Sequence, residues 1–436
     1  MNILLINHHA GSLQHGMEYR PYYLARAWIA LGHRVRIVAA DHSHVRRENP
    51  CLNKRSRLDQ QIDGIEYTWL NTPGYTGNGP ARIQNMLIFL FRLHYFSTAL
   101  ARSFRPDVVI ASSTYPLDIW PAYRIARHAG ARLLFELHDL WPLSPIELGG
   151  YSRWHPFIQV LQAAENFACR NCDAIVSMLP NVRGHLEAHG MAPHKLHIIP
   201  NGTDAAEWRD APAPLSETVA NTFCQLQKAG FLLVGFAGAH GLANALDTLL
   251  DAARLLSEVP VRFVLAGSGP EKSRLQARVR DERLNSVIFI DAVAKKQIPS
   301  LLRAFDVAYI GLQRQPLFRF GISPNKLIDY MMAGCPVLQA IEAGNDPVGE
   351  ARCGLTVAAE DPEAVAAGIR TLLAMPPAQR KAMGRNGTRF VLENLTYDVL
   401  GKRFLHACVS QRQRNVSSVS SLAPNNSSTS IGSSHE

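Results

Sequence analysis

The sequence lacks the features that mark several large classes of protein. No apolar run approaches the roughly 20 residues that span a bilayer, and Met1–Asn7 reads as a buried strand and not as a signal peptide. It has no Gly-x-Gly-x-x-Gly motif, no Asp-rich metal motif and no nucleic-acid recognition motif. These absences argue against a membrane-spanning or nucleic-acid-binding protein, and we expect no nucleic-acid partner and no essential metal.

Cysteine is present without a framework. The chain has seven cysteines, an odd number, and only Cys169 and Cys172 form a C-x-x-C pair. A structural zinc site would need a second pair, so we interpret these two as small buried thiols on a helix. A reduced, cytosolic setting fits this pattern.

Length and composition favour two folded domains. The chain has 436 residues, of which 47% are hydrophobic and 19% are charged, which is the profile of a soluble folded protein. Its formal net charge of +9 favours anionic partners such as nucleotide phosphates or anionic lipid.

Short apolar runs alternate with helical patterns twice along the chain. The first half has buried strands expected at 3–6, 34–39, 108–111, 132–136, 174–177 and 196–199. The pattern restarts with strands expected at 232–236, 262–266, 287–290, 307–310 and 336–339. Alternation of this kind predicts parallel sheets covered on both faces. The predicted fold class is therefore α/β, with two Rossmann-like, doubly wound domains and a cleft between them.

The predicted organisation has five parts. Residues 1–200 form the first domain, 201–228 a linker rich in Pro and Ala, and 229–378 the second domain. Residues 379–410 form C-terminal helices, and the Ser- and Asn-rich residues 411–436 form a disordered tail.

A basic, apolar helix is expected at residues 82–102. Large apolar side chains fill it, and Arg82, Arg92 and Arg102 punctuate it. Such a helix would lie in a membrane interface with its cations on the headgroups. A core helix packed on the sheet is the alternative, and the sequence leaves both open.

The loop after the first strand leads into a helix and carries the first candidate site. Gly16 would let a diphosphate approach the backbone at the helix N-terminus, and Arg20 would add a bidentate phosphate contact. We predict that His8, His9 and Glu18 bind a second substrate, the acceptor of a transferred group. A polar turn whose glycines give only backbone freedom is the alternative.

A second candidate site follows the strand expected at 132–136. His138 would hydrogen-bond a sugar hydroxyl or stabilise developing charge, and Asp139 would orient it or bind substrate. We predict both as catalytic, because strand ends are where sites form in this fold class. The alternative is a helix N-cap by Asp139 beside a satisfied core histidine.

The densest group of matched features lies in residues 318–337. Ser323 is a favourable N-cap, followed by a proline that suits the first helical position. Lys326 adds a charge in the first turn, near the free amides beside Gly321. One turn further along, Asp329 would accept hydrogen bonds from both ribose hydroxyls. A well-capped helix with a surface lysine and aspartate is the alternative.

At these positions the sequence resembles the family 4 glycosyltransferases, which have the GT-B fold. The resemblance covers residues 1–410 and is greatest to the branch that transfers N-acetylated amino sugars such as L-fucosamine in O-antigen and capsule synthesis. It is carried by Asn7-His8, His15–Leu24, Asp139–Ser144, Ile199–Gly202, Gly238–Asn244 and Ser323–Gly334. It implies an N-terminal acceptor domain, a C-terminal nucleotide-sugar-binding domain, and a final helix that crosses back to the first.

The resemblance also assigns roles. Gly16 matches the family's glycine near the donor diphosphate, and His138 matches its histidine near the transferred sugar. Asp329 takes the place of the second glutamate of the family's glutamate pair, which holds ribose. The expected donor is UDP-linked, and the predicted donor-binding residues are Gly16, Arg20, His240, Gly241, Arg319, Gly321, Ser323, Asn325, Lys326 and Asp329.

The sequence departs from the family at three positions. The first glutamate of the pair falls at Gly321. The Arg and Lys that stabilise the leaving diphosphate align with Ala239 and Asn244. The candidates to replace these cations are Lys326, Arg20, Arg319 and His240.

The implied reaction is transfer with retention to a polyprenyl-diphosphate-linked saccharide. Such an acceptor implies a cytoplasmic protein, peripheral on the inner membrane through residues 82–102. Two alternatives stay open. A nucleotide-sugar 2-epimerase of the GT-B fold would need no acceptor, and a non-catalytic nucleotide-sugar-binding subunit would tolerate the missing cations.

Overall fold

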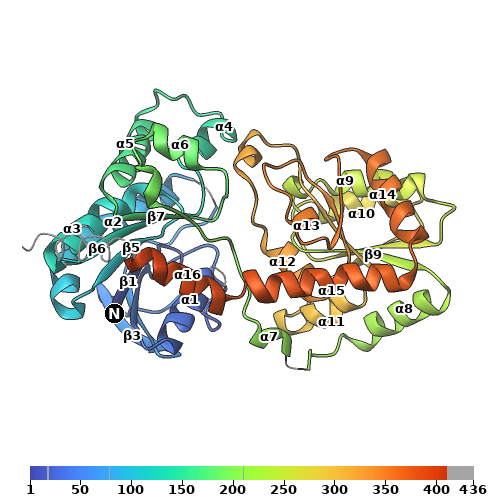
Figure 1. Ribbon diagram of the computed structural model, residues 1–436, viewed down its shortest axis with the longest axis horizontal. Coiled ribbons are helices and arrows are strands. Elements are labelled where there is room, and N and C mark those ends of the chain that lie inside the picture. The colour runs from blue at the N-terminus through green and yellow to red at the C-terminus, as the bar shows by residue number, and fades with distance from the viewer. Residues whose placement is uncertain (17–18, 78, 210, 410–436) are drawn as a thin grey trace, which may run out of the picture.

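The computed structural model describes residues 1–16, 19–77, 79–209 and 211–409 and shows two α/β domains side by side (Figure 1). Each domain is built on one sheet with helices on both faces. The prediction of two Rossmann-like, doubly wound domains is therefore confirmed. The predicted disordered tail, residues 411–436, lies outside the described residues.

The first domain has an eight-stranded sheet in the order β3-β4-β2-β1-β5-β6-β7-β8. Every neighbouring pair is parallel except β3 with β4. Its strands are β1 Asn2–Ile6, β2 Arg34–Ala40, β3 Arg57–Ile62, β4 Ile65–Leu70, β5 Val108–Ala111, β6 Arg132–Leu137, β7 Ala174–Ser177 and β8 Leu196–Ile198. Its helices are α1 Tyr19–Ala30, α2 Pro80–Phe104, η1 Pro116–Asp118, α3 Ile119–Ala129, α4 Leu143–Glu147, α5 Pro156–Asn171, α6 Arg183–Ala188 and η2 Pro193–Lys195.

The β3–β4 hairpin is an addition to the predicted fold, because no strand was expected between residues 39 and 108. The strands pair antiparallel with Ile62 opposite Ile65, so Asp63 and Gly64 form a two-residue turn. Both turn residues have positive φ, 50° and 82°, as a hairpin turn that follows the sheet twist requires. The edge strand β3 is polar on its outer side, and this hid it from a search for apolar runs.

The second domain has a six-stranded, fully parallel sheet in the order β11-β10-β9-β12-β13-β14. Its strands are β9 Leu232–Ala237, β10 Val261–Ala266, β11 Val287–Ile290, β12 Val307–Gly311, β13 Val337–Ala340 and β14 Gly354–Val357. Its helices are α8 Glu217–Lys228, η3 Leu242–Asn244, α9 Leu246–Leu255, α10 Lys272–Asp281, η4 Lys295–Gln297, α11 Ile298–Arg303, η5 Pro316–Phe320, α12 Asn325–Met332, α13 Pro347–Glu350 and α14 Pro362–Ala374.

The segment predicted as a linker is largely helical. It contains α7, Ala206–Arg209, and α8. The side chain of Phe223 on α8 is buried against Phe305 of the second domain, so α8 is packed onto that domain and the residues before it lead from the first sheet to the second.

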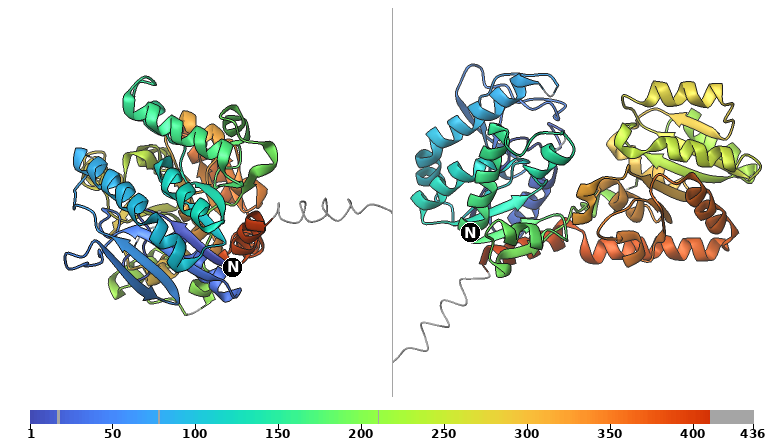
Figure 2. Two further views of the ribbon diagram at one scale, coloured as in Figure 1. Left: turned by 90° about the vertical axis from the view of Figure 1, so that its left-hand side faces the viewer. Right: turned by 90° about the horizontal axis from the view of Figure 1, so that it is seen from above.

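Two C-terminal helices span both domains. Helix α15, Pro377–Asn394, lies along the second domain, where Thr388 Oγ1 donates to the carbonyl of Met331 at 2.8 Å. Helix α16, Tyr397–Val409, lies against α1, and the indole of Trp28 donates to the carbonyl of Gly401 at 3.1 Å. In the right-hand view of Figure 2, the orange-red helix α15 runs along the lower edge of the second domain, on the side that faces the viewer in Figure 1.

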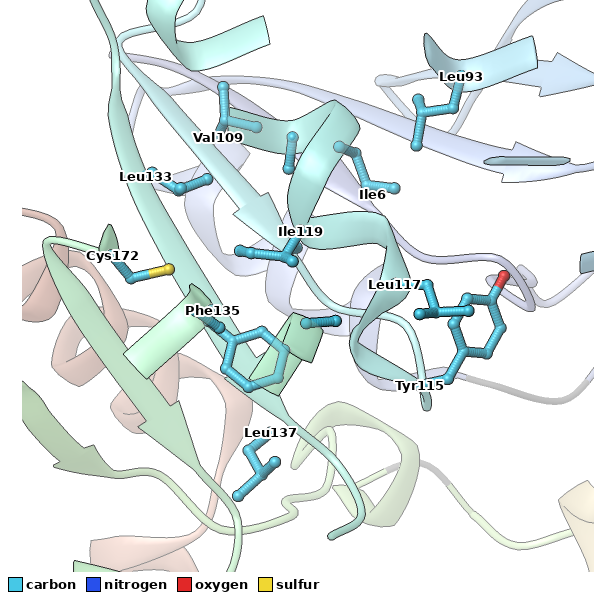
Figure 3. Close-up of a cluster of buried hydrophobic side chains, with 14 of the residues drawn as sticks. Ile6, Leu93, Val109, Tyr115, Leu117, Ile119, Leu133, Phe135, Leu137 and Cys172 are labelled. Carbon is cyan, nitrogen blue, oxygen red and sulfur yellow. The ribbon is translucent and has the colours of Figure 1, made fainter. Parts of the chain in front are cut away.

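The cores explain why the strands read as short apolar runs, because parallel strands covered on both faces bury both sets of side chains. In the first domain, Ile6, Val109 and Phe135 from three neighbouring strands meet Leu93 of α2 and Ile119 of α3 (Figure 3). Full burial of each such side chain contributes about 1.5–3 kcal/mol.

Among the described residues, no helix is long and apolar enough to span a membrane. Cys169 and Cys172 are both buried thiols, as the sequence predicts.

Candidate active site

The two domains touch at the carboxyl ends of their parallel strands. Asn181, shortly after β7, donates from its backbone to the carbonyl of Phe320 at 3.0 Å and from its side chain to the carbonyl of Gly344 at 2.7 Å. Phe320 follows β12 and Gly344 follows β13. Ligands of open α/β sheets bind at these strand ends, so the facing edges form the candidate site.

On the second domain, the loop after β9 is packed tightly against the loop after β10. The backbone amide of His240 donates to the carbonyl of Ser268 at 2.7 Å. A Cβ added at Gly267 would lie 1.9 Å from the carbonyl oxygen of Gly238, and both glycines have large positive φ. Glycine is therefore required where these loops cross. The His240 ring is buried, neither ring nitrogen has a partner among the described residues, and burial lowers its pKa.

Lys326 places a cation beside Ala239 and Asn244, the positions at which the family's Arg and Lys are absent from this chain. Its ammonium donates to the side-chain oxygen of Asn244 and lies 4.6 Å from the centre of the Phe236 ring. The amide group of Asn244 donates in turn to the carbonyl of Ala239 at 2.9 Å. Burial lowers the pKa of Lys326 to about 8. The lysine on α12 therefore lies beside Ala239 and Asn244, the two positions at which the expected cations are missing.

The turn before α12 corrects the predicted capping. Ser323 does not cap the helix; its hydroxyl accepts from the amide of Asn201 at 2.9 Å, and its carbonyl accepts from the Asn201 side chain at 2.8 Å. Asn201 follows β8, so these bonds tie the first domain to the start of α12. Gly321 has φ of 98° and lies beside Pro180, and Asn325 is exposed in the first turn of the helix.

Asp329 lies on α12 one turn beyond Lys326. Its carboxylate makes no hydrogen bond within the described parts of the chain, and burial raises its pKa to about 7. The charges that act on it most are those of Lys295 and Glu207. A carboxylate that receives no hydrogen bond from the protein is suited to accept hydrogen bonds from ligand hydroxyls.

On the first domain, His138 is held by a buried network that begins at the end of β6. Its Nε2 lies 2.9 Å from Ser112 Oγ and 3.3 Å from Glu136 Oε2. Arg20 donates to Glu136 Oε1 at 2.9 Å. Burial alone would raise the pKa of Glu136, but Arg20 and His138 hold it down to about 2. The result is a fixed carboxylate that orients the imidazole.

Two predicted roles change as a consequence. Arg20 is buried and also donates to the carbonyls of Pro200 at 2.6 Å and Ile199 at 2.9 Å, so it positions Glu136 and offers no open fork to a phosphate. Asp139 accepts from the Leu140 amide, the Trp141 indole and the Ser144 hydroxyl. It therefore shapes the turn before α4, and Glu136 takes the orienting role predicted for it.

The predicted acceptor-binding residues differ in whether the protein already satisfies their hydrogen bonds. His8 is fully buried, with Nδ1 on the Tyr115 hydroxyl and Nε2 2.7 Å from Asn85 Oδ1, and burial lowers its pKa to about 3. It is a satisfied core histidine. His9 has Nδ1 on Ser43 at 2.9 Å but leaves Nε2 buried without a partner in the described chain. Glu18 lies outside the described residues.

Three further donor-site predictions can be placed. Gly16 has φ of 80°, and an added Cβ would lie 3.2 Å from the Cβ of Arg47, so glycine suits this turn. Gly241 has nothing within 4 Å of an added Cβ. Arg319 pairs with Glu147 of the first domain through two hydrogen bonds of 2.9 and 2.7 Å, so it joins the domains.

Sequence reasoning missed the partners of these groups. Ser112 is the first residue after β5, and its hydroxyl donates to Glu136 at 2.6 Å. Asp118 lies nearby with one oxygen buried and unpartnered in the described chain, and burial raises its pKa to about 7. Lys295 reaches from the second domain to the Tyr23 hydroxyl at 2.6 Å. Only the strand-end position of Ser112 was a signal in the sequence.

Comparison with known families accounts for both domains. The glycosyl transferase 4-like domain model matches residues 15–202, and the model of glycosyl transferases group 1 matches residues 232–375. The chain is 23% identical over 359 residues to WcaI of Escherichia coli, described as a glycosyl transferase of colanic acid biosynthesis. The match covers 80% of this chain and 86% of that protein.

Solved structures share the two-domain fold at low identity. Sucrose-phosphate synthase from Thermosynechococcus elongatus has a TM-score of 0.67 at 17% identity and covers 96% of this chain and 99% of its own. HepE from Anabaena, solved in complex with UDP and glucose, has a TM-score of 0.61 at 16% identity and covers 97% of this chain and 100% of its own.

Proposed function

Because the chain belongs to the family 4 glycosyltransferases of the GT-B fold, we propose that it transfers an N-acetylated amino sugar from a UDP-linked donor. The proposed acceptor is a polyprenyl-diphosphate-linked saccharide in the assembly of a surface polysaccharide such as O-antigen or capsule. The likeness to WcaI, described for colanic acid, supports the pathway class. The UDP complex of HepE supports the donor class.

The position of Lys326 is the observation that carries this proposal. Its ammonium lies on Asn244, beside the loop after β9, where the donor diphosphate of this fold is expected. A preorganised cation at a developing negative charge lowers the barrier to its departure. We assign to Lys326 the leaving-group stabilisation that the absent Arg and Lys would supply, and to Asp329 the ribose hydroxyls.

The proposed reaction is front-face attack with retention. The acceptor hydroxyl oxygen bonds to the anomeric carbon as the bond from that carbon to the diphosphate oxygen breaks. The hydroxyl proton passes to the leaving diphosphate, whose new charge Lys326 stabilises. His138, held by Glu136 and Ser112, hydrogen-bonds the transferred sugar. With the charge provided by the protein, we expect transfer to persist in the presence of EDTA.

The outer side of α2 supports a peripheral position on the cytoplasmic face of the inner membrane. Ile83, Leu87, Phe91 and Tyr95 recur every fourth residue, so they lie on one face of the helix, and Phe91 and Tyr95 are 70% and 72% exposed. Side chains on the opposite face of α2 pack into the core. One face of residues 82–102 therefore belongs to a core helix, and the other is exposed and available to a membrane interface. An apolar face of this kind would bring the enzyme to its lipid-linked acceptor.

The function is tested with purified protein, a panel of nucleotide sugars, and a polyprenyl-diphosphate saccharide. We expect one UDP-sugar to bind by ligand-observed NMR and to release UDP only when acceptor is added. Product NMR should show retained anomeric configuration. Epimerised free donor without acceptor would favour the 2-epimerase, and binding without turnover under every acceptor would overturn the transferase.

The membrane proposal is tested by co-sedimentation with vesicles that contain anionic phospholipid. We expect wild type to bind and Phe91→Glu to lose about tenfold in affinity, because it puts a charge in the apolar contact. The exposed Leu392 on α15 gives the matched control, since Leu392→Glu leaves α2 intact. Equal binding of all three proteins would remove α2 as the contact.

A further inference from the structure

A group of three metal-ligand side chains lies in the first domain, apart from the residues assigned to the reaction. Glu165 is on α5, and His185 and His189 are one turn apart on and just after α6, which runs beside α5 (Figure 1). One ligand atom from each lies within 4.8 Å of the other two. Histidines four residues apart on a helix present their rings to one side.

The charge of Glu165 is unusual for its surroundings. The side chain is fully buried, and its ion-pair partners among the described residues are His185 Nε2 at 2.8 Å and His189 Nε2 at 3.9 Å. No lysine or arginine of the described chain pairs with it. Buried carboxylates are usually paired with a cation or bound to a metal, so the two imidazoles and the carboxylate together resemble a cation site.

The hydrogen bonds around the group orient it as metal ligands require. His189 Nδ1 lies 2.8 Å from the carbonyl of His185 and donates to it, so Nε2 is the ring nitrogen that faces Glu165. Gln162 donates to the second carboxylate oxygen at 2.8 Å. Ligating histidines typically donate their other ring nitrogen to a carbonyl, and ligating carboxylates are themselves hydrogen-bonded.

We propose that Glu165, His185 and His189 bind one zinc ion. Two imidazoles and one carboxylate are a common zinc ligand set, with a fourth position open to water. Tetrahedral coordination needs ligand atoms about 3.3 Å apart, so His189 moves inward and the metal replaces the proton between His185 and Glu165. Both rings are partly exposed, which gives the ion a route in.

The site would brace the contact between the domains. The ring of His185 lies edge-on to Phe320 of the second domain, with centroids 5.7 Å apart, and the carbonyl of Phe320 accepts from Asn181. A metal that fixes α6 to α5 would fix the surface on which Phe320 rests. This role is structural, so the zinc ion takes no part in the proposed chemical step, and zinc binding is measured separately from transfer.

The test titrates untagged, metal-free protein with Zn²⁺ against a chromophoric chelator and with Co²⁺ by visible absorption. We expect one equivalent of Zn²⁺ to bind, tetrahedral Co²⁺ bands to appear, and the thermal midpoint to rise. His189→Ala keeps the bond between His185 and Glu165, and we expect it to bind zinc at least about tenfold more weakly. His185→Ala should remove the Co²⁺ bands.

The controls separate this site from other histidines. His194 is exposed nearby, and His44 belongs to a second group of histidines that packs around Tyr75. We expect His194→Ala and His44→Ala to bind zinc as wild type does. Metal-free His189→Ala should melt like metal-free wild type, which excludes misfolding. Equal zinc affinity in wild type, His185→Ala and His189→Ala would overturn the site.

Discussion

The two sides of the candidate cleft treat their polar groups in opposite ways. On the first domain, buried Arg20, Glu136 and Ser112 form a hydrogen-bonded chain that reaches the partly buried His138. On the second, the Asp329 carboxylate and both ring nitrogens of His240 have no hydrogen-bond partner within the described chain. The first arrangement holds one imidazole in place, whereas the second leaves groups free for a ligand. We therefore assign structural support to the first side and, on the proposed function, donor recognition to the second.

The largest expected effect comes from removing the cation on the donor side. Lys326→Met should lower kcat/KM about 100- to 1000-fold, as loss of one preorganised donor to a developing charge does. Because its pKa is lowered to about 8, the ammonium loses its proton above that pH, and kcat/KM of wild type should fall there. Steady-state UDP release between pH 6 and 9.5 measures both effects.

Two variants make the Lys326 experiment specific. Lys326→Arg keeps a cation and should retain part of the activity without the fall above pH 8. Lys296→Met removes an exposed lysine of η4 and should leave kcat/KM unchanged. An equally small loss in Lys326→Met and Lys296→Met would show that the leaving group is stabilised elsewhere.

The next effect is on stability and belongs to the first domain. Glu136→Gln leaves the Arg20 charge buried and unpaired, which typically costs about 3–5 kcal/mol. The folded pKa of Glu136 is depressed from 4.5 to about 2. Its contribution, about 3 kcal/mol, is therefore present above pH 4.5 and lost as the pH falls toward 2. Urea unfolding at pH 7 and pH 3 should show wild type and variant converging in acid.

A second paired carboxylate, Glu147, tests whether burial sets the size of the effect expected for Glu136. Glu147→Gln breaks the pair with Arg319, which is half exposed, and should change the free energy of unfolding by less than about 1 kcal/mol. Glu136→Gln should also change the pH profile of kcat, because His138 loses its orienting partner, whereas a purely structural role would leave that profile unmoved. Identical destabilisation by both variants would show that burial adds nothing to the contribution of the Arg20–Glu136 pair.

Candidate site residues are easier to recognise from the sequence on the second domain than on the first, because on the second domain they are neighbours along one helix. Lys326 and Asp329 belong to one helix whose ends and periodicity are visible in the residues around them. The pairing of Arg20 with Glu136 joins residues 116 positions apart and depends on how α1 packs on the sheet. His8 was assigned to a ligand because its loop position is visible, while its enclosure by Tyr115 and Asn85 is a tertiary property.

The same distinction holds for the fold. Strands buried on both faces stand out as apolar runs, so β1, β5, β7 and β11 are predicted within one residue of their bounds. The polar edge strand β3 is not, although the Asp63-Gly64 dipeptide between two isoleucines is a hairpin signal that would have revealed it. The capping of α12 was mispredicted because Ser323 is bonded to Asn201, across the domain contact.

The smallest expected effect is on donor affinity and concerns Asp329. Burial raises the pKa of Asp329 from 3.8 to about 7, and the ionised form is the better acceptor for ribose hydroxyls. Donor affinity should therefore rise as the pH rises through 7. Asp329→Asn should bind the donor about tenfold more weakly at pH 8 and without this pH dependence, a loss of about 1.4 kcal/mol. Calorimetry at pH 6 and 8 measures both.

For Asp329, the free energy of unfolding should change with pH in the direction opposite to donor affinity. Between pH 3.8 and 7 the folded protein holds a proton that the unfolded chain releases, so this group lowers the stability as the pH rises through that window. Asp329→Asn removes the buried charge and should be more stable than wild type at pH 8, whereas Glu136→Gln is less stable. Opposite signs in urea unfolding at pH 8 would mark one carboxylate as a support and the other as a ligand contact, and equal signs would remove that division between the two sides of the cleft.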